Sequence, residues 1–141
     1  MASRRKGRIL AFQALYFWDL NTVPVEELVS FAWLSEEKIN SMDADIAAFS
    51  RNLIAGSIEN IESIDKNIKD HLVNWDITRL NRVDLAVLRI SVYTLMYQNE
   101  IPPSIVIDEA IGICREYGTD ESHKFVNGVL DSIKKTLQEK K

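Results

Sequence analysis

The sequence has little of the chemistry that builds disulfides or metal sites: one cysteine and two histidines in 141 residues. The single cysteine, Cys114, forms no intrachain disulfide, so a reducing compartment such as the cytoplasm is expected. His71 and His123 are far apart in the chain, and we interpret each as a surface or capping residue rather than a ligand. We therefore expect no metal site.

Glycine and proline are also scarce, with five and three residues, and the sequence contains neither a phosphate-binding glycine loop nor a nucleophile elbow. Asp43 and Asp45 fall at an expected helix start, where the helix dipole favours carboxylates without a metal. Asp108 and Glu109 are adjacent, so a helix points them in different directions and they do not form an acid and base pair. The sequence thus predicts no catalytic residue and no cofactor, and we do not expect an enzyme.

Long hydrophobic runs are missing as well. The apolar stretch after the basic start resembles a secretory signal, but Gln13 interrupts it, Asp19 ends it and no small-residue cleavage site follows. The stretch is also too short to span a bilayer. With 46% hydrophobic and 27% charged residues, the chain is expected to fold as one globular domain over residues 1–141, in the cytoplasm and away from membranes.

Apolar residues recur with the period of an α-helix almost throughout, which predicts an all-α fold. The stretch from Leu80 to Tyr97 is the most hydrophobic and is apolar on several sides, so we expect a central, buried helix there. Ile107, Ala110, Ile111, Cys114 and Tyr117 mark another helix, with Gly118 as its expected C-cap. Cys114 lies on the apolar stripe of this helix, hence in the core.

The other expected helices cover about Ser3–Leu20, Val25–Trp33, a stretch from Asp43 to Leu72 broken near Ser57–Asn60, and a last helix from Thr119 or Asp120. Ser35–Met42 has no clear pattern. About seven helices with short connections predict a compact helical bundle, or two small bundles packed together.

Charge is divided unevenly along the chain. The net charge is −4, yet the first eighteen residues hold Arg4, Arg5, Lys6 and Arg8 and no acid, which leaves −8 for the rest. Positive charge at a helix start opposes the helix dipole. Such arginine-rich segments often become ordered on RNA, where guanidinium groups bind phosphate and stack on bases. A solvated, frayed terminus has the same pattern, so both interpretations stay open here.

A second candidate for RNA contact is the segment Glu121–Leu130. Its expected core stripe is formed by Val126, Val129 and Leu130, which leaves Phe125 at the edge of that stripe beside Lys124. An aromatic ring next to a lysine can stack on a base. The same ring can also fold over the margin of the core, and the sequence alone does not separate the two.

Together with Val83–Ile90, these segments resemble the NusB family, and the resemblance extends over nearly the whole chain. The matching blocks are Arg4-Arg5 with Arg8, Gln13-Ala14-Leu15-Tyr16, Val83–Ile90, Ile107-Asp108-Glu109-Ala110-Ile111 and, most specific, Ser122-His123-Lys124-Phe125-Val126-Asn127-Gly128-Val129-Leu130. The resemblance implies two three-helix halves with an additional short helix. It also implies an antitermination factor that binds the boxA element of ribosomal RNA leader transcripts together with NusE, a small-subunit ribosomal protein, within the RNA polymerase antitermination complex.

The resemblance also implies which residues make contacts. Contact with RNA is carried over to Arg4, Arg5, Lys6, Arg8, Gln13, Glu121, Lys124 and Phe125, and contact with NusE to Tyr16 and Asp84. Glu121 can accept hydrogen bonds from base edges but repels phosphate. Members of the family are monomers or homodimers, and both states stay open for this chain.

Gly7 interrupts the basic run where a helix former is expected, at a cost of about 1 kcal/mol in a helix interior. It predicts that residues 1–8 form a flexible basic arm. Two other functions remain: a protein adaptor of the transcription or ribosome-assembly machinery, in which the basic arm is incidental, and a stand-alone relative of the NusB-like domain of ribosomal RNA methyltransferases.

Overall fold

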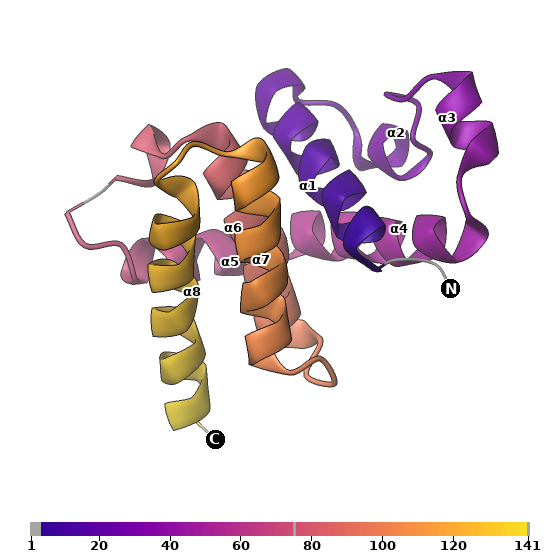
Figure 1. Ribbon diagram of the computed structural model, residues 1–141. Coiled ribbons are helices and arrows are strands. Elements are labelled where there is room, and N and C mark those ends of the chain that lie inside the picture. The colour runs from indigo at the N-terminus through magenta and orange to yellow at the C-terminus, as the bar shows by residue number, and fades with distance from the viewer. Residues whose placement is uncertain (1–3, 75, 141) are drawn as a thin grey trace.

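The computed structural model describes residues 4–74 and 76–140, and it is all-α over these residues (Figure 1). The helices are α1 (Arg4–Asn21), α2 (Val25–Val29), α3 (Glu36–Ser41), α4 (Ala44–Glu59), α5 (Ile61–Asp70), α6 (Arg82–Tyr97), α7 (Pro103–Tyr117) and α8 (Ser122–Glu139), with a 3-10 turn, η1 (Ile77–Arg79), before α6. The all-α prediction is therefore confirmed. Among the described residues, none of the helices has the length and apolar character needed to cross a membrane.

Side-chain caps set several of the helix starts. The Asp43 carboxylate accepts hydrogen bonds from the backbone N–H groups of Asp45 and Ile46, at 2.8 and 3.2 Å, and so begins α4. Ser35 accepts from the N–H of Lys38 and begins α3 in the stretch where the sequence showed no clear pattern. This short helix is the one that the expected set of about seven lacked, because its signal is a cap rather than an apolar stripe.

Helix α6 is the shared centre of the fold. It packs against α1, α4, α5, α7 and α8. All residues from Asp84 to Val92 are buried, as expected for the most hydrophobic stretch of the sequence. In Figure 1, α1 to α4 gather on one side of the molecule and α7 and α8 stand side by side on the other. The expected two-part bundle is thus present, with α6 contributing to both parts.

The turn between α7 and α8 differs slightly from expectation. Gly118 is the C-cap of α7, as predicted, and its N–H donates to the Cys114 carbonyl oxygen at 2.8 Å. The last helix begins at Ser122 rather than at Thr119 or Asp120, because the Ser122 hydroxyl oxygen accepts from the Thr119 N–H at 2.9 Å and so stabilises a turn there. Cys114 is fully buried, as its place on the apolar stripe predicted.

The start of the chain departs from the expected flexible arm. Residues 1–3, including the expected helix start at Ser3, lie outside the described residues, but Arg4 to Arg8 form the first turns of α1. Gly7 is buried against α4: a Cβ atom at this position would lie 2.5 Å from the Phe49 ring. The prediction of an arm over residues 4–8 is therefore wrong, because the missing side chain of Gly7 lets α1 approach α4 and that packing outweighs the low helix propensity of glycine.

Candidate nucleic-acid interface

Two of the basic residues at the start of α1 face α7. The Arg5 Nε atom donates to the Glu109 Oε2 atom at 2.6 Å, and the Arg8 guanidinium lies 3.8 Å from the same oxygen. This hydrogen bond raises the pKa of Arg5, whereas burial lowers the pKa of Arg8. The Arg5 side chain keeps 42% of its surface exposed and that of Arg8 only 12%. Arg5 is therefore oriented by α7 yet accessible to a ligand.

Arg4 and Arg8 instead share Phe49 on α4. The guanidinium carbons lie 4.6 and 5.3 Å from the centre of the Phe49 ring, within the range of a cation–π contact. The expectation that positions 4 and 8 occupy one face of the helix is confirmed by this common neighbour. Phe49 gave no signal in the sequence, because its partners precede it by more than forty positions and no motif connects them.

The position of Arg5 also depends on a glycine of α7. A Cβ atom on Gly112 would lie between 2.4 and 2.8 Å from three atoms of the Arg5 guanidinium. The guanidinium thus lies across the Gly112 backbone, one helical turn after Glu109. Sequence reasoning assigned no contact to either α7 residue: Glu109 was rejected as half of a catalytic pair and otherwise noted only within a matching block, and Gly112 follows no recognisable pattern.

Lys6 and Gln13 lie on another side of α1, where they line a cleft of about 570 Å³. The remaining lining residues come from the other parts of α1, from α3 and its flanks, from the start of α4 and from the end of α7: Ile9, Leu10, Leu34, Lys38, Ser41, Met42, Asp43, Ile46 and Tyr117. The basic residues of α1 therefore point in three directions, toward α7, toward α4 and into this cleft.

The second predicted segment forms the beginning of α8. Glu121 and Lys124 are exposed, and their charged atoms are 4.0 Å apart. Phe125 is half-buried, packs against the core and lines a hollow of about 290 Å³. The ring therefore covers the core margin, as one of the two interpretations expected, while part of its surface faces the hollow. Stacking of this ring on a base stays a prediction.

Asp84, an expected partner contact, lies in the wall of the same hollow. Only 7% of its surface is exposed, and its Oδ1 atom has no hydrogen-bond partner among the described residues. Burial raises the pKa of Asp84, and a hydrogen bond with Ser122 opposes part of that shift. Tyr16, the other expected partner contact, is 37% exposed on α1. A cationic or hydrogen-donating group entering the hollow would therefore find an acceptor in Asp84.

The two predicted RNA segments lie beside different parts of α7. Arg5 and Arg8 reach α7 at Glu109, whereas α8 begins five residues after α7 ends at Tyr117. Eight residues of helix separate Glu109 from Tyr117, a rise of about 12 Å. The cleft that contains Gln13 and Tyr117 lies along this interval. Arg5 and Arg8 thus contact the middle of α7, whereas the Glu121–Phe125 segment follows its end.

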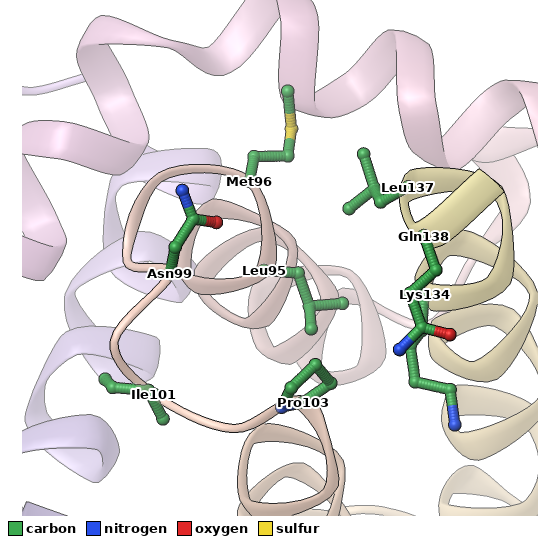
Figure 2. Close-up of a pocket in the computed structure, with 8 residues that line it drawn as sticks. All are labelled: Leu95, Met96, Asn99, Ile101, Pro103, Lys134, Leu137 and Gln138. Atoms are coloured by element: carbon green, nitrogen blue, oxygen red, sulfur yellow. The ribbon is translucent and has the colours of Figure 1, made fainter. Parts of the chain in front are cut away.

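The remaining candidate features lie away from this surface. Figure 2 shows a hollow of about 200 Å³ where the end of α6 and the loop after it meet the end of α8; it is lined by Leu95, Met96, Asn99, Ile101, Pro103, Lys134, Leu137 and Gln138. His71 joins α5 to α8 through contacts of 2.7 Å with the Asn67 carbonyl oxygen and 2.9 Å with the Thr136 hydroxyl. Across residues 4–74 and 76–140, no cluster of three metal-ligating side chains occurs.

Comparison with known proteins gives consistent matches over most of the chain. A sequence model of the NusB family matches residues 5–135. The transcription antitermination protein NusB of Treponema denticola is 53% identical over 131 residues, which cover 93% of this chain and 95% of that protein.

Solved structures agree in fold. T. maritima NusB has a TM-score of 0.84 at 37% identity, covering 95% of this chain and 92% of its own. A structure of the antitermination factors NusB and NusE in complex with double-stranded RNA has a TM-score of 0.84 at 34% identity, covering 94% of this chain and 96% of the matched one.

Proposed function

This chain belongs to the NusB family, and we propose on that basis that it is a transcription antitermination factor that binds RNA rather than an enzyme. Its RNA would be the boxA element of a ribosomal RNA leader transcript, bound as a single strand. NusE would bind beside it, within the RNA polymerase antitermination complex, in the cytoplasm. Residues 1–141 would act as one RNA-binding domain.

The observation that carries the proposal is the arrangement of cationic and aromatic groups along α7. Arg5 and Arg8 lie against the middle of α7, and Lys124 and Phe125 lie at the start of α8, which follows the end of α7. Phosphate neutralisation supplies most of the affinity of such a surface, and stacking on an aromatic ring adds to it. Arg4, Lys6, Gln13 and Glu121 complete the proposed RNA contacts, with Glu121 accepting from base edges.

Glu109 both orients Arg5 for RNA and competes with RNA for it. It holds the Arg5 guanidinium across Gly112 before RNA arrives, which lowers the entropy that the side chain loses on binding. It also competes with phosphate for the same guanidinium. Binding of RNA therefore exchanges one carboxylate partner for a phosphate partner, and the affinity of the protein alone is modest.

NusE would contact Tyr16 and Asp84. The buried Oδ1 atom of Asp84 supports this assignment, because a buried acceptor without a partner gains a hydrogen bond when a donor enters the hollow. Because the hollow also contains Phe125, a partner bound there would order the RNA surface. We therefore expect RNA and NusE to bind with positive coupling.

The test is fluorescence anisotropy of a labelled boxA-type RNA titrated with the protein, with and without NusE. A scrambled RNA of equal length and a double-stranded form of the boxA RNA serve as comparisons, since one solved relative is bound to double-stranded RNA. Specific binding that tightens with NusE supports the proposal. If about four phosphates are neutralised, the logarithmic salt slope for a single strand is about −3.

Two substitutions separate the contribution of phosphate neutralisation to RNA affinity from that of base stacking. Arg5→Gln should weaken all RNAs alike, whereas Phe125→Ala should cost about 1–3 kcal/mol wherever a base stacks. A protein adaptor is the alternative function, favoured by the ion pairs that Arg5 and Arg8 already form with Glu109. Binding of NusE with no affinity for any of the RNAs would establish the adaptor and reject the proposal.

A further inference from the structure

The cleft between α1, α3 and the end of α7 has a chemistry that the surface around Arg4, Arg5 and Arg8 lacks. Its walls are largely apolar, and its polar groups include Lys6 and Gln13 from α1, Lys38 from α3 and Tyr117 from α7. At about 570 Å³ it is the largest of the hollows described here. Lys38 and Tyr117 belong to neither of the segments assigned to RNA contact above.

Two of these groups are cations that form no ion pair among the described residues. Neither the Lys6 nor the Lys38 ammonium lies within 4.0 Å of a carboxylate oxygen in the described part of the chain, in contrast to Arg5 and Arg8. Asp43 also lines the cleft, but its carboxylate caps α4 by accepting from two backbone N–H groups. With two ammonium groups, Lys6 and Lys38, and one carboxylate, Asp43, the lining of the cleft carries a net charge of +1, which favours phosphate beside an inserted group.

Tyr117 supplies an aromatic wall. Its side chain remains 39% exposed, and its ring centre is 5.2 Å from that of the buried Phe12, at an interplanar angle of 56°. A ring fixed from behind and open in front loses little entropy when a base stacks on it. The Gln13 amide, in the same cleft, offers both a donor and an acceptor to a base edge.

We propose that this cleft binds one unpaired nucleotide of the RNA, with its base against Tyr117 and Gln13 and its flanking phosphates at Lys6 and Lys38. The inference rests on the proposed RNA-binding function and extends it. The cleft continues the surface from the arginines toward Glu121, because Tyr117 is only four residues before Glu121. The strand would thus follow α7 and turn one base inward between the two segments.

The first test compares two lysines that differ in position and not in charge. Lys38→Gln removes a cation of the cleft, whereas Lys69→Gln makes the same change on α5, which packs against α6, α8 and α4. Anisotropy titrations with labelled single-stranded boxA-type RNA over a salt series should show a logarithmic slope less steep by about 0.7 for Lys38→Gln. Lys69→Gln should match the unmodified protein.

The outcomes separate the two proposals. If the unmodified protein binds RNA and Lys38→Gln keeps its slope and affinity, the cleft inference is overturned and the RNA-binding function stands. If the unmodified protein binds no RNA with or without NusE, the function fails and the inference fails with it.

The second test addresses the base. Tyr117→Phe keeps the aromatic face and should bind as the unmodified protein does, whereas Tyr117→Leu should lose about 5- to 150-fold in affinity. Because Tyr117→Leu also removes a contact with Phe12, crosslinking of the unmodified protein provides an independent readout. RNA carrying 4-thiouridine at successive positions should give a crosslink to the peptide that contains Tyr117 or Lys38. Crosslinks confined to residues 4–8 and 121–125 would overturn the inference.

Discussion

Arg89 on α6 binds Asp65 on α5 through two parallel hydrogen bonds, from Nε to Oδ1 at 3.0 Å and from Nη2 to Oδ2 at 2.9 Å. The same guanidinium lies 3.4 Å from the Asp19 carboxylate of α1. Only 8% of Arg89 is exposed. One buried cation thus connects three helices, and its geometry is the planar, bidentate kind that lysine cannot reproduce.

Replacing Arg89 by methionine should therefore destabilise the protein by about 3 kcal/mol, because Asp65 is left partly buried without its partner. Urea unfolding followed by circular dichroism measures the change. Arg82→Met is the matched control: Arg82 is on the same helix and binds the same Asp19, but its side chain is 45% exposed. The control should lose less than about 1 kcal/mol. Equal losses in the two variants would contradict the importance assigned to burial.

Glu109 should limit the affinity for RNA when the protein is alone. Glu109→Gln releases Arg5 and Arg8 from a competing carboxylate, and an ion pair this exposed has a strength of at most about 1 kcal/mol. Affinity for boxA-type RNA should therefore increase by up to about fivefold at low salt. Asp108→Asn changes the charge of the neighbouring exposed residue, for which no ion pair occurs among the described residues. A gain from Asp108→Asn as large as that from Glu109→Gln would indicate a general charge effect.

Replacing Gly128 by alanine should increase the stability of the protein. It lies in α8, and a Cβ atom there would have no heavy atom within 4 Å. Gly128→Ala should stabilise the protein by about 0.5–1 kcal/mol, since alanine loses less backbone entropy in a helix. The measurement is the midpoint of chemical unfolding at constant m-value.

Gly118 provides the contrast to Gly128. A Cβ atom there would lie 2.7 Å from the Ser122 Cβ and 2.8 Å from the Cys114 carbonyl oxygen, and a backbone atom does not move aside cheaply. Gly118→Ala should therefore destabilise the turn before α8 by about 1–3 kcal/mol. Stabilisation by both alanine variants would mean that the turn is looser than described.

Asp84 should give stability a dependence on pH opposite to that of the surface carboxylates. Burial raises its pKa above 3.8, so the folded protein holds this proton to higher pH than the unfolded chain does. Its contribution is therefore full at low pH and is lost as the pH rises from the ordinary value through the raised one. The stability difference between the unmodified protein and Asp84→Asn should fall across that window, as measured by urea unfolding over a pH series.

Asp131→Asn serves as the reference for this experiment. Lys135 and Lys134 lower the pKa of Asp131, so its contribution is present above the ordinary value and is lost as the pH falls through the lowered one. The two variants should thus show trends of opposite sign. A pH-independent difference for Asp84→Asn would show that this carboxyl titrates alike in the folded and unfolded states.

Most of the fold could be predicted because its signals are local. The apolar character of Leu80–Tyr97 identified the central helix α6, and the Asp43 cap and Gly118 C-cap follow from residue type. Gly7 was misread, since helix propensity says nothing about Phe49, a residue more than forty positions away that occupies the space beside it. The error shows that a glycine in a helix has two physical explanations, and only contacts between helices separate them.

The candidate site was predicted in its residue types but not in its geometry. The basic run and Phe125 are visible in the sequence, and Arg4 and Arg8 share a face as helical spacing requires. The sequence does not reveal that Glu109 orients Arg5, or that Lys38 from α3 lines the same cleft as Lys6. Both relations join segments far apart in the chain, where spacing carries no information.

The central place of α6 has a consequence for how the protein is made. Helices α1 and α4 pack against α6, yet α6 ends only at Tyr97, and α7 and α8, which also pack against it, follow later. During synthesis, α1 to α4 emerge from the ribosome before the helix that completes their core. The nascent chain therefore exposes apolar surface until most of its length has been translated, and protection by a chaperone or by the ribosome itself is most needed in that interval.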